Sequence, residues 1–381
     1  MVTGGGTLRA KNLTVETKGN SSAAIRSDRG GGTETINGGT YTASGVGSPA
    51  IYSTADVSVE NAVLNSTVSE GAVIEGLNSI SLNNTIINNS NTKLNGNSET
   101  YKNIFIYQSM SGDAEEGTGT FSAKNSTLNE SHGDNFFVTN TAAKITLENN
   151  KFENTSDDFV FLKAASGKWG NAGSNGGNVT LLATNQNLKG DFVIDEVSAL
   201  SLSLDQGSYL LGAINQANAA NKTEVSLDDD SIWVLTADSY LDSLTDSVAT
   251  TKNIYGNGYD LFVDGSAVET NAETPPAMDE SDDGADLDVV ATETPAETTP
   301  TPTPAPNAGN DGSAEILWWI LGGVAGGILD GGGQHIGDFL GVVLIDVDGY
   351  QAVFTTGDDD GIGIGGPLHF VGSVIAGHGA D

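Results

Sequence analysis

Two short strand-like patterns alternate along the first two-thirds of the chain. In the first pattern, apolar residues occupy alternate positions, an Asn follows, and another apolar residue comes after it. Such alternation is typical of a strand with one buried face. Since Asn tolerates the left-handed backbone region, we expect it at a sharp corner, where stacked Asn side chains can hydrogen-bond. The pattern occurs at residues 8–15, 57–64, 80–87, 121–128 and 145–152, with its corner at Asn12, Asn61, Asn84, Asn125 and Asn149.

The second pattern is a compact run of three residues, most of them large and apolar. Its centres follow one another after 22, 32, 32, 23 and 33 residues. We interpret these steps as a repeat of about 22 to 24 residues, with loops of about ten residues inserted in some copies. The centres are Ile51, Val73, Phe105, Phe137, Val160 and Val193.

The repeats predict an all-β fold, a right-handed parallel β-helix (a pectate-lyase-like solenoid), over residues 1–268. In such a solenoid each repeat buries its apolar face against its neighbours, so many repeats are needed. An antiparallel sandwich, the competing interpretation, would show shorter hairpin spacing and turn pairs such as Asn-Gly between strands. Met1 leads directly into repeat sequence with no secretory signal. Because natural solenoids cap their terminal repeats, we expect an N-terminal truncation; a cytoplasmic protein is the alternative.

The composition changes after the repeats. Residues 269–312 are rich in Pro, Thr and acidic residues, which predicts a disordered linker. Residues 313–330 resemble an incomplete transmembrane segment, since the uninterrupted apolar or Gly run at 316–329 is shorter than the roughly 20 residues of a full span. Membrane attachment through this run is therefore possible. Residues 331–381 form a Gly- and Asp-rich tail, either natural or the result of a frame change near Leu329.

Charge and cysteine content exclude several classes of function. The formal net charge is −35, and all 15 Lys and Arg residues lie at or before Lys252. Nucleic acids and anionic membrane surfaces are poor partners, because phosphate binding needs clustered basic residues. An anionic polysaccharide could bind only through an intervening cation. The absence of Cys excludes disulfides and thiolate metal sites.

Candidate binding residues come from aromatic and acidic side chains in the inserted loops. Aromatic rings stack on the apolar face of a sugar, which points to Trp169 in a Gly- and Asn-rich loop and to Tyr101 and Tyr107, which flank the apolar run around Phe105. Carboxylates suit calcium, although solvated loop carboxylates are the alternative. The candidate calcium ligands are Asp113, Glu115, Glu116, Asp157 and Asp158.

Enzymatic cleavage of a polysaccharide has less support in the sequence. A uronate lyase needs a basic side chain for the proton α to the carboxylate, and Lys151, Lys163 and Lys168 are available, but nothing marks one of them as perturbed. Hydrolysis needs converging carboxylates, yet the adjacent Asp157 and Asp158 would point to opposite faces of a strand. His132 stands alone in a loop, and a lone loop histidine is more often a solvated surface residue than a catalyst.

Four segments resemble a known bacterial family. They are residues 38–41, 47–53, 70–76 and 107–112. The family is described as carbohydrate-binding domain-containing protein, a β-helix family with a cellulose- and polygalacturonate-binding member. The resemblance covers roughly residues 5 to 265. It implies a secreted or surface-attached bacterial β-helix with calcium in its structure that binds plant cell-wall glycans without cleaving them.

Two hypotheses of different classes follow. The first is a noncatalytic extracellular carbohydrate-binding or adhesin-like surface module for plant cell-wall or other polysaccharide. The second is a calcium-dependent polysaccharide lyase-like enzyme, which rests on fold analogy alone. A structural spacer without a specific ligand is a third possibility. Nothing in the sequence indicates an oligomeric state.

Overall fold

The computed structural model describes residues 1–96, 98–248, 250–281, 283–287, 340–347 and 350–356. The chain divides into two units: Met1–Gly309 with Gly341–Thr355, and Asn310–Leu340 with Thr356–Asp381. The second unit lies almost entirely outside the described residues, as does the predicted membrane segment at 316–329. The part that is described is all-β, without a helix, and therefore offers no helix that is long and apolar enough to cross a membrane.

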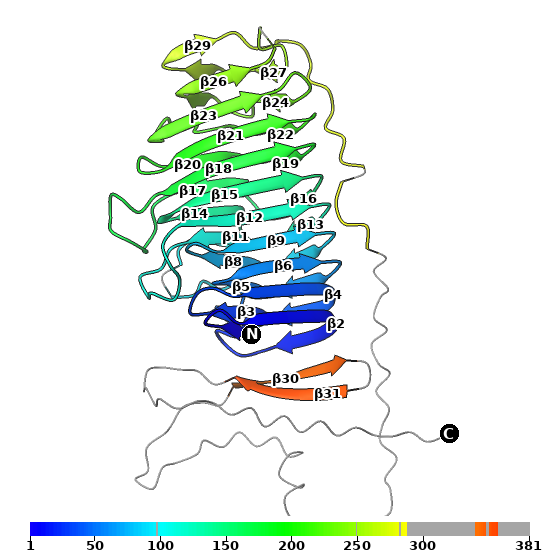
Figure 1. The fold of residues 1–381 in the computed structure, drawn as a ribbon. Coiled ribbons are helices and arrows are strands. Elements are labelled where there is room, and N and C mark those ends of the chain that lie inside the picture. The colour runs from blue at the N-terminus through cyan, green and yellow to red at the C-terminus, as the bar shows by residue number, and fades with distance from the viewer. Residues whose placement is uncertain (97, 249, 282, 288–339, 348–349, 357–381) are drawn as a thin grey trace, which may run out of the picture. The chain divides into compact units, whose positions relative to one another are not determined.

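Large parallel sheets form most of the first unit (Figure 1). The largest sheet has 14 strands, which we divide into a first and a second stack joined through the long strand β4. The first stack consists of β2 (Thr7–Thr17), β4 (Thr33–Ala43), β6 (Asp56–Glu60), β9 (Ser79–Asn83), β12 (Thr118–Lys124), β15 (Thr141–Glu148), β18 (Gly177–Thr184), β21 (Ala199–Asp205), β23 (Lys222–Leu227) and β26 (Ser243–Asp246). The second stack consists of β7 (Val63–Ser66), β10 (Ile86–Asn89), β13 (Thr127–Glu130) and β16 (Lys151–Asn154).

A sheet of eight strands forms the third stack. Its members are β1 (Val2–Thr3), β3 (Ile25–Asp28), β5 (Ile51–Ser53), β8 (Ala72–Glu75), β11 (Lys102–Tyr107), β14 (Asp134–Thr139), β17 (Leu162–Ala164) and β20 (Phe192–Ile194). A four-stranded sheet contains β19 (Asn187–Lys189), β22 (Tyr209–Leu211), β24 (Ile232–Val234) and β27 (Ile254–Tyr255). A three-stranded sheet contains β25 (Ser239–Leu241), β28 (Leu261–Val263) and β29 (Ser266–Val268). The two strands β30 (Leu340–Val347) and β31 (Tyr350–Thr356) form a separate sheet. The pair β28–β29 is antiparallel.

From β6 to β17 the chain visits the first, second and third stacks in turn, and the inward side chains of the three stacks meet in one core. Ile36 of β4, Leu64 of β7 and Ile51 of β5 belong to the same buried cluster. The aromatic side chains Phe136 and Phe161 extend this core, with ring centroids 5.6 Å apart. Burial of apolar surface between repeats, each incomplete alone, stabilises the whole array.

The predicted Asn corners are confirmed. All five have positive φ, from 46° at Asn84 to 55° at Asn61. The corners from Asn61 onward lie between a strand of the first stack and one of the second. Asn84 donates to the Oδ1 atom of Asn61 over 2.8 Å, which shows the expected stacking of corner side chains. In the second repeat the corner is Gly38, since a Cβ atom there would lie 2.0 Å from the Oδ1 atom of Asn12.

One apolar run differs in position from the sequence interpretation. The run centred on Val160 precedes β17, and the residues in register with Phe136, Phe137 and Val138 are Leu162, Lys163 and Ala164. Phe161 enters the core from the turn before the strand begins, where it is fully buried. This apolar run therefore marks the residue that enters the core, Phe161, rather than the strand itself.

Residues 273–281 and 283–286, which we call the strap, run back along the side of the strands (Figure 1). The Tyr209 hydroxyl donates to the Pro276 carbonyl over 2.8 Å, and the Ala285 amide donates to the Thr127 hydroxyl over 3.0 Å. The Asp286 amide donates to the Oδ1 atom of Asn84 over 2.8 Å. Side chains of the strands thus satisfy backbone groups of the strap, which belongs to the predicted linker at 269–312. The rest of that linker lies outside the described residues.

Candidate functional site: an aromatic cluster on the outer face of the third stack

A ladder of large side chains follows the outer face of the third stack. Tyr52, Val73, Phe105, Phe137 and Lys163 are register partners on five consecutive strands. They face outward because their strand neighbours face the core, and side chains alternate between the faces of a strand. The rings of Phe105 and Phe137 stack with centroids 5.5 Å apart. The outer face of this sheet is therefore unusually apolar.

Tyr107 and Trp169 cover this ladder. The Tyr107 ring stacks on Phe105 with centroids 4.4 Å apart, and Trp169 meets Tyr107 edge-on at 5.1 Å. The side chain of Asn175 donates to the backbone carbonyl of Trp169 over 2.8 Å, which fixes the loop that carries it. Trp169 is partly exposed, whereas Phe105 and Phe137 are buried. We call the group Tyr52, Val73, Phe105, Tyr107, Phe137, Ala165 and Trp169 the outer cluster.

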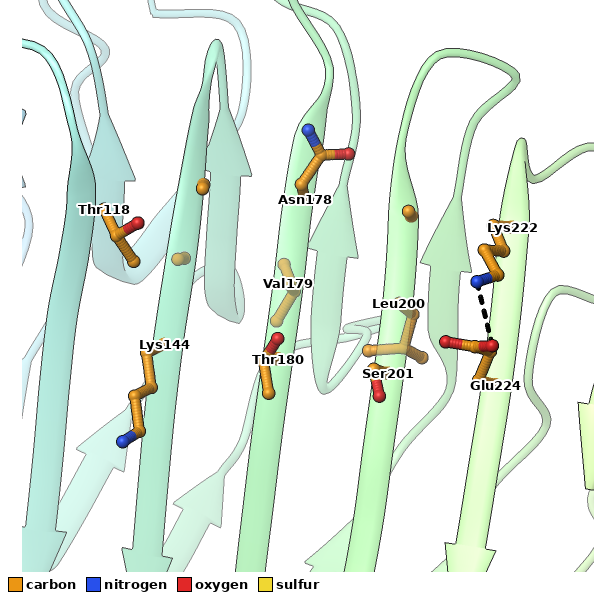
Figure 2. A pocket seen from close by; sticks show the side chains of 12 residues that line it. Thr118, Lys144, Asn178, Val179, Thr180, Leu200, Ser201, Lys222 and Glu224 are labelled. Atoms are coloured by element: carbon orange, nitrogen blue, oxygen red, sulfur yellow. Dashed lines mark ion pairs between the residues drawn. The ribbon is translucent and has the colours of Figure 1, made fainter. Parts of the chain in front are cut away.

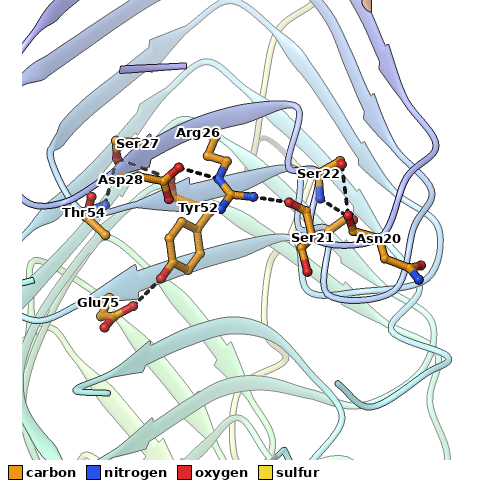
Figure 3. Close-up of polar contacts among 10 residues, drawn as sticks. Asn20, Ser21, Ser22, Arg26, Ser27, Asp28, Tyr52, Thr54 and Glu75 are labelled. Carbon is orange, nitrogen blue, oxygen red and sulfur yellow. Dashed lines mark hydrogen bonds and ion pairs between the residues drawn. The ribbon is translucent and has the colours of Figure 1, made fainter. Parts of the chain in front are cut away.

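A buried carboxylate ties the tyrosines of the outer cluster together. Glu75, only 1% exposed, accepts hydrogen bonds from the hydroxyls of Tyr52, Tyr107 and Ser109. Figure 3 shows the Tyr52 hydroxyl directed at Glu75. Burial raises the pKa of both phenols, and the nearby Glu75 carboxylate adds to the rise. Both tyrosines therefore stay protonated as donors, and the loop that contains Ser109 is held against the sheet.

Positive charge also reaches the outer cluster. The Arg26 guanidinium lies 5.8 Å from the centre of the Tyr52 ring and pairs with Asp28 over 2.8 Å (Figure 3). The Lys102 ammonium lies 4.4 Å from the centre of the Phe105 ring and pairs with Glu70 over 2.8 Å. Cations over aromatic faces are favourable, and each of these two is also neutralised by a carboxylate.

The structure brings together two of the three sequence-predicted aromatic residues. Tyr107 and Trp169 share the outer cluster. Tyr101 lies apart from them, half-buried, with its ring 4.5 Å from that of His132. Sequence reasoning missed Tyr52 and Glu75. The repeat position of Tyr52 carried a signal, because Tyr52 occupies the same place in its apolar run as Val73, Phe105 and Phe137.

The predicted calcium ligands lie in exposed turns and loops. Asp113, Glu115 and Glu116 follow the third-stack strand β11, while Asp157 and Asp158 lie between β16 and β17. Within the described ranges, no group of three or more His, Cys, Asp or Glu side chains is placed to hold a metal ion. Calcium binding through these residues stays a prediction.

A hollow of about 550 Å³ on the outer face of the first stack is a second candidate (Figure 2). Short side chains such as Ala142 and Ala199 leave the space, and Lys144, Lys222 and Glu224 border it. Lys222 pairs with Glu224 over 2.9 Å. Aromatic side chains do not line this hollow, so it offers a sugar ring no stacking surface.

Comparison with known proteins adds no assignment. No protein-family model, curated protein or solved structure matches this chain.

Proposed function

We propose that residues 1–268 form a right-handed parallel β-helix that binds polysaccharide without cleaving it, as an extracellular or cell-surface module of a bacterium. The observation that carries the proposal is the partly exposed Trp169 ring, seated on Tyr107 and Phe105 and fixed through Asn175. A rigid aromatic surface binds the apolar face of a pyranose at low entropic cost. The single core shared by the three stacks supports closure of the solenoid.

The state of the basic side chains favours binding over lyase chemistry. Lys151 pairs with Glu153 over 2.6 Å, and Lys168 pairs with Glu99 over 3.0 Å. The remaining candidate base, Lys163, lies 5.8 Å from the centre of the Phe137 ring. A general base works best when its pKa lies near the operating pH, whereas the hydrogen bond and charge of Glu153 raise the pKa of Lys151.

Replacing Trp169 by alanine in the full chain tests the proposal. We expect retention on insoluble cellulose to weaken about tenfold or more, because an aromatic anchor that the ligand covers carries a large share of the binding energy. Pull-down at a series of protein concentrations measures the change. Tyr259→Ala is the matched control, since Tyr259 is 43% exposed and belongs to a turn remote in sequence from the cluster. Equal retention of the Trp169 variant and the wild-type chain would contradict the proposal.

A further inference from the structure

A groove of about 650 Å³ follows the C-terminal ends of the second-stack strands. Its floor is an outward ladder of register partners on five consecutive repeats: Thr42, Asn65, Asn88, Asn129 and Glu153. Side-chain hydrogen bonds join the first four of these residues. Asn65 donates to Thr42 over 3.1 Å, Asn88 donates to Asn65 over 2.9 Å, and Asn129 donates to Asn88 over 2.8 Å. We call this feature the amide ladder.

The amide ladder has a direction, and it ends in an unused acceptor. Each Asn donates one N–H to the preceding repeat and keeps a second N–H, because an amide nitrogen carries two. The Oδ1 atom of Asn129 has no hydrogen-bond partner, since the next register partner is Glu153, whose carboxylate is also an acceptor. Buried acceptors of this kind are costly unless a donor reaches them.

The lining selects against anionic ligands. Its twelve residues include two carboxylates, Glu130 and Glu153, and no Lys or Arg. Glu130 is buried and accepts from Asn89, and burial raises the pKa of its carboxyl. Glu153 pairs with Lys151. An anionic polymer would meet these carboxylates without a free cation in the lining, whereas neutral hydroxyl groups can both donate and accept there.

The strap fixes the neighbouring surface. Its Ala285 amide is bound to Thr127, and the space next to Gly284 is filled by Thr127 and Lys151, the register partners on β13 and β16. Thr127 and Lys151 lie two residues before Asn129 and Glu153 on the same strands, and so on the same outer face. The amide ladder therefore lies beside the strap, on strands that the strap holds in place.

We propose that the amide ladder binds a neutral linear polysaccharide that runs along the stack. Sugar hydroxyls donate to Glu153, and they accept from the second N–H groups of Asn65, Asn88 and Asn129. Repeats spaced about 4.8 Å apart offer a periodic row of such groups. This proposal rests on the proposed function and names its ligand class, while it assigns a surface separate from the outer cluster.

Calorimetric titration of the full chain with cellohexaose, xylohexaose and hexagalacturonate tests the proposal. We expect binding of a neutral hexasaccharide, and a loss of affinity of about fivefold or more in Asn88→Ala/Asn129→Ala, since several hydrogen bonds are removed. Thr180→Ala, in the hollow of the first stack, is the control and should change the affinity less than about twofold. Thermal unfolding of each variant shows whether its fold is retained.

The outcomes separate the two proposals. Unchanged affinity of the folded double variant, together with a loss in Trp169→Ala, would overturn the amide ladder and leave the outer cluster as the binding surface. Tighter binding of hexagalacturonate than of both neutral sugars would overturn the ligand class. No binding of any of the three by the wild-type chain would contradict the proposed function itself.

Discussion

Replacing Lys102 by methionine is expected to lower the free energy of unfolding by about 3–5 kcal/mol, because the substitution leaves the Glu70 carboxylate buried without its partner. Lys102 is completely buried, and its ammonium lies 2.8 Å from Glu70 and also contacts the Ser98 hydroxyl. Burial alone would raise the pKa of the Glu70 carboxyl, but the Lys102 ammonium and the Ser69 hydroxyl hold it below its ordinary value. Urea unfolding measures the difference.

Two further variants isolate the cause. Glu70→Gln/Lys102→Met removes both charges, and much of the lost stability should return, since a neutral pair avoids an unpaired buried charge. Lys124→Met removes one partner of the exposed pair Lys124–Glu148 and should cost less than about 1 kcal/mol. A loss below about 1 kcal/mol in Lys102→Met would show that the buried pair contributes no more than a surface pair.

The free energy of unfolding should fall as the pH rises from 4.5 to 7, and the buried carboxyl group of Glu34 should account for part of the fall. Its side chain is fully buried in β4 between the register partners Leu8 and Val57. No donor meets the distance and angle of a hydrogen bond to either carboxyl oxygen. Burial raises the pKa of Glu34 from 4.5 to about 7; the amino terminus and the Val2 amide oppose the rise, and Asp28 adds to it.

The sign follows from which form the folded state prefers. A raised carboxyl pKa means that the folded protein favours the protonated acid, so this contribution is complete below the unfolded pKa near 4.5 and is lost as the pH rises through 7. A shift of this size corresponds to about 3 kcal/mol. Urea unfolding at pH 5 and pH 8 measures it, with Glu34→Gln as the control for the repulsion among the other carboxylates. Equal pH dependence of Glu34→Gln and the wild-type chain would contradict the assignment.

The strand stacks and their corners could be predicted because they depend on local pattern. The alternation around Asn61 and Asn84 places strands on either side of each corner, and the corner conformation is a property of Asn itself. The offset at Phe161 could not be predicted, because the sequence shows that a residue is buried without showing whether a turn or a strand delivers it to the core.

The site could be predicted only in part, because its contacts depend on register between repeats of unequal length. Glu70 and Lys102 are 32 residues apart, and an inserted loop hides their pairing. Asn88 and Asn129 are 41 residues apart, although each lies four residues after a corner Asn. Counting from the corners rather than along the chain would have aligned the amide ladder. The placement of Trp169 on Tyr107 depends on a loop conformation that no repeat pattern specifies.

Retention of the full wild-type chain on insoluble polysaccharides tests the central claim most directly. The chain is incubated with cellulose, with insoluble xylan and with a pectate gel, and the unbound fraction is measured together with any release of soluble sugar. The account predicts retention on a neutral polysaccharide without release of soluble sugar. Release of sugar products would contradict a noncatalytic module, and an unbound fraction equal to that of a non-binding control protein on all three matrices would contradict polysaccharide binding.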